Sequence, residues 1–398
     1  MTPHVTTPAI RSRAATAFTT VLCGLAVTAC GGNAEPAGQP DSSAVPHGHV
    51  DGAEEAAEPQ LRLVLADADG RGVHVLDLLT EDVTELPGDG RVTGAVTDGR
   101  FAFLAGQGRT RVVDSGGWAV AHGDHHHYYR TRAGRVGTLD GTVTGAWSDS
   151  EVTALARDDG TTVLLDREKL DAGEVGERET VDGVAVPYEQ HLVVAGRDGI
   201  TVRERDGGQV ADLGAACREP EDAAVTNRGV VFGCAGGAVL VDAGDGADGG
   251  FVGEEMPYPD GGPRAGAFRQ RPGSGTLGAV AGRDGAWSLD TGEGRWTRAE
   301  SGPAAAVTAT GADGPLLVLT RDGVLHAYDA GTGEETATAT LLDGDVPDGV
   351  TIAADTERAY VNDPAASTVH EIDYHDELRV ARTFDVGVTP SRFVETGR

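Results

Sequence analysis

The sequence predicts an all-β protein built as a single β-propeller. Short β-prone runs recur about every 40 residues, glycine-containing turns separate them, and no long segment has apolar residues at the helical spacing of 3.6. A repeat of this length, with three or four short strands in each unit, is typical of propeller blades. We expect eight blades over residues 61–398. Seven blades are the alternative, because the stretch 122–170 is irregular.

Each repeat is recognised by a β-prone run that in most cases ends in aspartate. Asp-Gly pairs precede several runs, and glycine supplies the positive φ that a tight hairpin turn requires. The run at 392–395 is predicted to pair with the first blade, since closing the ring removes exposed sheet edges. The eight runs span 73–77, 111–114, 162–166, 200–203, 238–242, 286–290, 324–329 and 369–373.

The charge balance excludes several classes of partner. The chain of 398 residues has 63 acidic and 32 basic residues, and a formal charge of −31. Binding to nucleic acid needs clustered Lys and Arg, and so does docking of a basic surface on anionic lipid headgroups. We therefore expect no nucleic-acid partner. We expect a monomer whose acidic surface attracts cations.

Residues 1–29 are predicted to be a signal peptide. Arg11 and Arg13 precede an apolar run, 14–29, that is shorter than the ~20 residues a membrane-spanning helix needs. The sequence Val-Thr-Ala-Cys-Gly-Gly at 27–32 resembles the lipobox of bacterial lipoproteins, in which Cys30 would carry the lipid. An ordinary signal peptide with a chance cysteine is the alternative. The predicted location is the outer face of the cytoplasmic membrane, through a lipid anchor, or secretion.

Cys217 and Cys234 are predicted to form a disulfide. Cys23 leaves with the signal peptide and Cys30 takes the lipid, so an even pair remains in an extracytoplasmic protein. Closing this loop would stabilise the fold by roughly 3 kcal/mol in the chain-entropy model. A thiolate metal pair is the alternative, and it is disfavoured because the spacing is not that of a Cys-x-x-Cys knuckle.

Residues 30–60 are predicted to be a disordered acidic tether. Small residues, proline and acids dominate this stretch, which cannot bury enough apolar surface to offset its ordering entropy. The tether contains His47 and His49, a His-x-His pair followed by Asp51, Glu54 and Glu55. Such a pair could capture a cation weakly, and a chance pair in a linker is the alternative.

The strongest candidate site is a histidine cluster within six residues. In a strand, alternate residues share a face, so His125 and His127 are predicted to point the same way and His126 the opposite way. Imidazoles with one carboxylate form a ligand set that Zn²⁺ favours, although Cu(II) and nickel also bind imidazole. A solvated polar loop is the alternative. We predict that zinc is held by His122, Asp124, His125 and His127.

Other histidines are less informative. His326 and His370 lie inside predicted strands and are interpreted as structural residues, and His191 is a weaker candidate ligand. The sequence leaves open whether these three, or His126, take part in metal binding. Ligands from distant blades and the preferred metal are open as well.

Several segments resemble the AztD family of extracytoplasmic zinc metallochaperones. The most specific is His-Gly-Asp-His-His-His-Tyr-Tyr at 122–129, and the others lie within 64–78, 186–189, 257–268 and 359–374. The resemblance implies a β-propeller with a high-affinity zinc site near its centre. It also implies a mobile arm carrying His47 and His49, and handover of Zn²⁺ to the solute-binding protein of a zinc ABC importer. His126 and the lipid anchor depart from the family pattern.

Two other classes of function are alternatives. One is a metal-free propeller that serves as a scaffold or adhesion lipoprotein. The other is a zinc-dependent hydrolase, because three histidines and a water also form a catalytic zinc site. The sequence contains no Gly-x-Ser-x-Gly nucleophile elbow. We expect no enzymatic activity.

Overall fold

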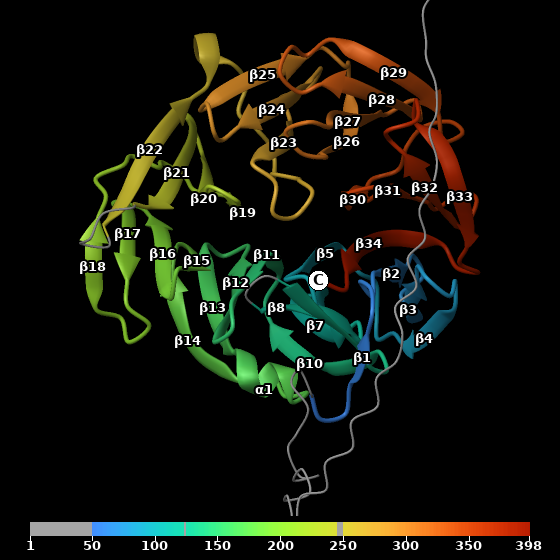
Figure 1. Cartoon of the computed structure of the whole chain (residues 1–398), viewed down its shortest axis with the longest axis horizontal. Helices are drawn as coiled ribbons and strands as arrows, with labels where there is room; N and C mark the ends of the chain where they lie inside the picture. Colours follow the sequence, from blue (N-terminus) through green and yellow to red (C-terminus); the bar gives the residue numbers. More distant parts are fainter. Residues whose placement is uncertain (1–49, 123–124, 245–249) are drawn as a thin grey trace, which may run out of the picture. The chain divides into compact units, whose positions relative to one another are not determined.

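The computed structural model describes residues 50–122, 125–244 and 250–398. The chain divides into two units, 1–47 and 48–398, and all described residues belong to the second. These residues form eight antiparallel sheets arranged in a ring, as Figure 1 shows, together with one further small sheet. The predicted eight-bladed propeller is confirmed.

The first four blades have four strands each, ordered from the centre of the ring outwards (Figure 1). The first contains β34 (Pro390–Thr396), β2 (Arg62–Asp67), β3 (Gly72–Asp77) and β4 (Val83–Pro87). The second contains β5 (Gly94–Thr97), β6 (Phe101–Gly106), β7 (Arg109–Asp114) and β10 (Gly134–Asp140). The third contains β11 (Val143–Ser148), β12 (Val152–Arg157), β13 (Thr161–Asp166) and β14 (Glu177–Asp182). The fourth contains β15 (Val184–Tyr188), β16 (His191–Gly196), β17 (Gly199–Arg203) and β18 (Gln209–Asp212).

The remaining blades follow in chain order. The fifth contains β19 (Asp222–Thr226), β20 (Gly229–Cys234), β21 (Gly237–Ala243) and β22 (Phe251–Pro257). The sixth contains β23 (Thr276–Val280), β24 (Ala286–Asp290) and β25 (Arg295–Ala299). The seventh contains β26 (Ala304–Ala309), β27 (Pro315–Thr320), β28 (Val324–Asp329) and β29 (Glu335–Thr340). The eighth contains β30 (Ile352–Ala354), β31 (Ala359–Asp363), β32 (Thr368–Asp373) and β33 (Arg379–Asp385).

Helix is scarce in the described part of the chain. The helix α1 (Arg167–Asp171) follows β13, and the 3-10 turn η1 (Pro259–Gly261) follows β22. No helix among the described residues is both long and apolar enough to cross a membrane.

The run that marks each repeat is the third strand from the centre. In the sixth blade the inner position is taken by an irregular segment, in which Arg269 bridges Gly278 of β23 and Ala265 bridges Ala281, the residue after β23. The aspartate that ends the run has a local role. In Asp77, Asp290 and Asp329, one carboxylate oxygen accepts hydrogen bonds from backbone N–H groups two and three residues further along the chain. The carboxylate thereby closes the turn to the outer strand, which explains why the run ends in aspartate.

The carboxyl-terminal strand closes the ring, as predicted. β34 pairs antiparallel with β2, with Val394 opposite Val64. Side chains of these two strands pack against the eighth blade in one apolar layer that includes Phe393, Leu65 and Tyr360. The core is thus a series of layers between neighbouring blades. Most of it is aliphatic, because the chain is only 5% aromatic.

The predicted disulfide is present. Cys217 and Cys234 are bonded and buried in the layer between the fourth and fifth blades. The bond ties the segment that precedes β19 to the end of β20.

The additional small sheet contains β8 (Gly117–His122), β9 (His125–Arg130) and β1 (Glu54–Ala56), in the order β1-β9-β8. The hairpin β8–β9 is inserted between the third and fourth strands of the second blade, which explains the irregular spacing there. β1 lies inside the predicted tether, so the expectation of disorder up to residue 60 is wrong for residues 54–56. They form a strand because β9 offers an edge for pairing.

Candidate metal-binding hairpin

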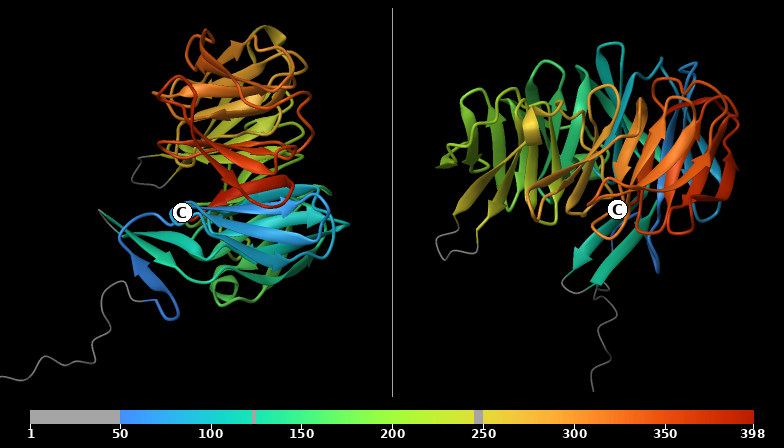
Figure 2. Two further views of the ribbon diagram at one scale, coloured as in Figure 1. Left: turned by 90° about the vertical axis from the view of Figure 1, so that its right-hand side faces the viewer. Right: turned by 90° about the horizontal axis from the view of Figure 1, so that it is seen from above.

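The candidate site lies on the hairpin β8–β9. The two strands pair without a register shift, from Gly117 opposite Arg130 to His122 opposite His125. Figure 2 shows that the hairpin projects beyond the body of the propeller. The resemblance implied a zinc site near the propeller centre. The described histidines of the motif, 125–127, lie on this projection, which is an insertion in the second blade.

Aromatic packing anchors the base of the hairpin. The rings of Trp118 and Tyr129 are stacked with centroids 5.3 Å apart, and both residues are buried. The guanidinium of Arg100 lies 3.9 Å from the centroid of the Trp118 ring and is itself paired with Asp114 at 2.7 Å. A cation held over an aromatic face is attracted by the ring quadrupole. The base is therefore rigidly attached to the second blade.

The histidines occupy the predicted faces. His125 and His127 lie on the same face, and their Nε2 atoms are 3.1 Å apart. His126 lies on the opposite face, where its ring is 6.3 Å from that of Tyr128 and nearly parallel to it. The Nε2 atoms of His125 and His127 thus face each other at the outer end of the hairpin.

A glutamate from β1 completes this face. Glu55 Oε1 lies 2.6 Å from His127 Nδ1. The register of β1 places Glu55 opposite Tyr129, which is two residues from His127 on the same face of β9. Burial, together with the charge of Glu55, raises the pKa of Tyr129. In the sequence Glu55 stands only among the acids of the predicted tether, since nothing local indicates a partner so far along the chain.

The neighbouring glutamate points to the other face. Glu54 is opposite Arg130 in the pairing of β1 with β9, and their side chains form an ion pair at 2.5 Å. The hydrogen bond and the charge of Arg130 hold the pKa of Glu54 below its usual value. Adjacent glutamates on one strand therefore have separate partners, one in the histidine pair and one outside it.

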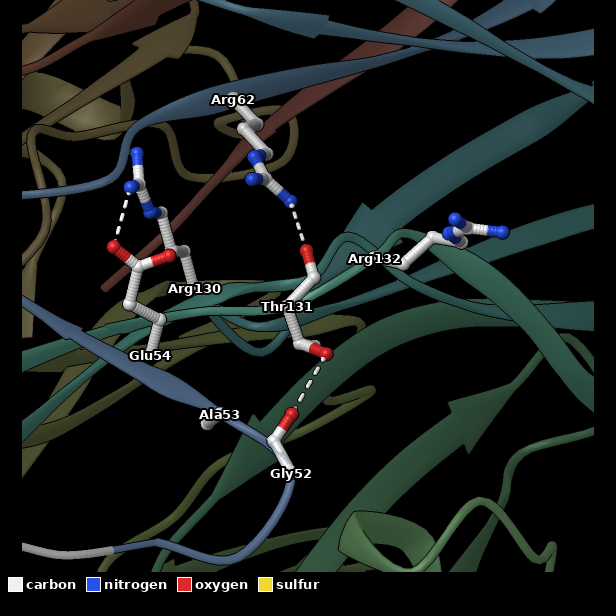
Figure 3. Close-up of a pocket in the computed structure, with 7 residues that line it drawn as sticks. All are labelled: Gly52, Ala53, Glu54, Arg62, Arg130, Thr131 and Arg132. Atoms are coloured by element: carbon white, nitrogen blue, oxygen red, sulfur yellow. Dashed lines mark hydrogen bonds and ion pairs between the residues drawn. The ribbon is translucent and has the colours of Figure 1, made fainter.

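An open pocket of about 500 Å³ adjoins the start of β1 (Figure 3). The Thr131 hydroxyl donates to the carbonyl of Gly52 at 3.2 Å, and Arg62 donates to the carbonyl of Thr131 at 3.1 Å. These contacts fix the chain immediately before β1. The pocket is lined by Gly52, Ala53, Glu54, Arg62, Arg130, Thr131 and Arg132.

The histidine pair fits part of a zinc site. Tetrahedral coordination with Zn–N bonds of 2.0–2.1 Å places two ligand nitrogens about 3.3 Å apart, close to the observed 3.1 Å. Within 50–122, 125–244 and 250–398, no group of three His, Cys, Asp or Glu side chains is arranged to hold a metal ion. The other predicted site residues lie outside the described residues: the His122 side chain, Asp124, His47, His49 and Cys30.

The remaining candidate histidines belong to other blades and have partners there. His326 and His370 lie on third strands from the centre, where their rings contact polar side chains of the same blade. The closest contacts are His191 Nδ1 to the Glu189 carbonyl at 2.6 Å, His326 Nδ1 to Glu335 at 2.6 Å, and His370 Nδ1 to the Thr383 hydroxyl at 3.2 Å. The structure therefore does not bring these three to the hairpin.

Comparison with known proteins shows that this chain is similar to solved structures in its fold. The sequence matches no protein-family model and no curated protein. Two structures of AztD from Citrobacter koseri, one of them the apo protein, are similar at 20% and 21% identity. Each has a TM-score of 0.69, with 85% of this chain and 98% of that chain covered. The chain thus has an AztD-like propeller fold.

Two further structures show how widely this fold occurs. The dihydro-heme d1 dehydrogenase NirN is 16% identical with a TM-score of 0.55, and 86% of this chain and 76% of that chain are covered. The computationally designed protein Ika8 is 16% identical with a TM-score of 0.51, and the coverage is 77% and 91%. Propellers support unrelated functions, so the fold alone does not indicate the function of this chain.

Proposed function

We propose that this protein is an extracytoplasmic zinc metallochaperone that delivers Zn²⁺ to the solute-binding protein of a zinc ABC importer. The observation that carries the proposal is the pair of Nε2 atoms, from His125 and His127, 3.1 Å apart on a projecting hairpin. The AztD-like fold and the formal charge of −31 support it. An acidic surface raises the local concentration of divalent cations.

In this proposal the hairpin holds zinc as cargo. His125 and His127 supply two ligands, and His122 and Asp124, predicted from the sequence, supply the others. Imidazole binds zinc only when it is neutral, so protons compete with the metal and acid favours release. A site at the end of a projection can be approached by a partner, which would take the ion by exchange of ligands one at a time. His47 and His49 would assist that exchange from the amino-terminal arm.

The decisive experiment measures zinc stoichiometry and affinity by chelator competition. We expect the full chain to bind one zinc ion at the hairpin, and the double variant His125→Ala/His127→Ala to lose it. His126→Ala is the matched control, because His126 belongs to the same strand and lies on the opposite face. An unchanged zinc content in the double variant would show that the site is elsewhere.

We propose a binding role rather than an enzymatic one. His127 contacts His125 and Glu55 on one face of the hairpin, and no nucleophile with an adjacent base stands out in the sequence. The zinc-loaded protein should therefore not turn over ester or phosphoester substrates above the rate of free zinc. Turnover that disappears in the His125→Ala/His127→Ala variant would favour the hydrolase instead.

We propose that Cys30 carries a lipid that holds the protein at the outer face of the cytoplasmic membrane. The support is the sequence 27–32, which resembles a lipobox. The full chain should be found in the membrane fraction, and Cys30→Ser should move it to the soluble fraction without altering zinc affinity. Equal partitioning of the two proteins would refute the anchor and leave zinc binding untouched.

A further inference from the structure

We propose that Glu55 is a positioning residue of the zinc site, through which the pairing of β1 with β9 sets the affinity for zinc. The inference rests on the proposed function. It adds a residue that does not bind the metal and comes from a segment 72 residues away from His127 in the chain.

The contact with Glu55 sets the tautomer of His127. A neutral imidazole carries one N–H, and either ring nitrogen can hold it. With Glu55 Oε1 2.6 Å from Nδ1, the N–H at Nδ1 donates to the carboxylate. The lone pair is then on Nε2, the atom that faces Nε2 of His125. A carboxylate behind a ligating histidine fixes the ring orientation and makes the ligand more basic.

The pairing of β1 with β9 brings Glu55 to His127. Its side chain lies on the face of the small sheet that carries His127, diagonal to it across the pair of strands. Diagonal neighbours in antiparallel strands are close enough for long side chains to meet. The His127 side chain is only 12% exposed and that of Glu55 is 47% exposed. The carboxylate of Glu55 therefore contacts the Nδ1 edge of the His127 ring, and the Nε2 edge faces His125.

The strand that carries the Glu55 carboxylate can separate locally from its neighbour. β1 has three residues and lies at the edge of the small sheet. It is held by the pair Glu54–Arg130 and by the contact of Gly52 with Thr131, both at the surface. Short edge segments with few buried contacts open locally without global unfolding. Separation of β1 from β9 would remove Glu55 from His127 and so weaken zinc binding. Displacement of β1 is thereby coupled to the release of zinc.

The test compares two glutamates on the same strand in the full chain. Glu55→Ala should weaken zinc binding by about 10–100-fold in chelator competition, the range found when such outer partners are removed. Glu54→Ala also removes one ion pair of β1, but on the other face, and should change the zinc affinity less than about threefold. Equal losses in the two variants would mean that β1 acts only by general support of the hairpin, and would overturn the proposal.

A spectroscopic measurement separates positioning from stability. In the metal-free protein, the ¹⁵N signals of His127 should indicate N–H at Nδ1, and Glu55→Ala should shift them toward a mixture of tautomers. Glu55→Gln keeps a side-chain oxygen that can accept from Nδ1 and should restore most of the tautomer and part of the affinity. Unchanged ¹⁵N signals in Glu55→Ala would overturn the role.

The outcomes also separate this inference from the proposed function. If the His125→Ala/His127→Ala variant loses zinc while Glu55→Ala keeps wild-type affinity, the zinc site stands and the role of Glu55 fails. If the double variant keeps its zinc, both fail.

Discussion

Two strands from the ends of the chain complete sheets in this protein, and they do so in different ways. β34 inserts seven residues into the first blade and buries Phe393 and Val394 against neighbouring blades. β1 adds three residues to the hairpin, and its two glutamates are exposed. The same antiparallel pairing thus closes the ring through apolar burial in one place, and joins β1 to the hairpin through a surface ion pair and a hydrogen bond in the other. The pairing of β34 with β2 stabilises the fold. The pairing of β1 with β9 can open without unfolding the propeller.

The largest expected effect is at the ring closure. Phe393→Ala removes a ring that is 3% exposed and leaves a cavity beside Leu65 and Tyr360. We expect it to lower the free energy of unfolding by about 3–5 kcal/mol in denaturant titration. Val120→Ala on the hairpin is the control, because Val120 is 44% exposed, and its effect should be within about 0.5 kcal/mol. Similar losses for the two variants would contradict the assignment of Phe393 to the buried layer that closes the ring.

The next effect concerns β1 and zinc affinity. Deleting residues 31–49 from the full chain keeps β1, whereas deleting 31–58 also removes Glu55. We expect the shorter deletion to change hairpin zinc affinity by no more than a few-fold, and the longer deletion to weaken it by about 10–100-fold, as for loss of an outer ligand partner. Chelator competition measures both, and thermal unfolding should be nearly the same for the two proteins. Equal affinities would show that β1 does not influence the site.

A smaller effect is expected from a buried acid on β34. Burial raises the pKa of Glu395, and Arg398, whose Nη2 is 2.7 Å from a carboxylate oxygen, only partly offsets this. Because the folded-state pKa exceeds the unfolded one, the stabilisation is complete below the unfolded pKa and is lost as pH rises through the folded pKa. Glu395→Gln should therefore become more stable relative to wild type as pH increases above about 4.5. A difference between the two proteins that does not vary with pH would contradict the assignment.

Much of the architecture could be predicted from local patterns. The eight runs correspond to the third position from the centre in all eight blades, if the irregular inner segment of the sixth blade is counted. In runs such as those ending at Asp77 and Asp290, the aspartate closes a turn in the same place. The facing of His125 and His127 follows from strand alternation alone. The sequence did not reveal the irregular inner segment of the sixth blade at Ala265–Arg269, because single bridges leave no periodic pattern.

The sequence by itself indicated eight repeats with seven as the alternative, the pairing of the two remaining cysteines, and the faces of His125, His126 and His127, because these depend on neighbours within a few residues or on simple counting. Only the tertiary structure decided that the histidine segment is a hairpin projecting from the second blade, and that Glu55 meets His127. The pairing of β1 with β9 joins positions more than seventy residues apart. Such a contact depends on which strand edges remain available once the blades have formed, and no local pattern encodes that.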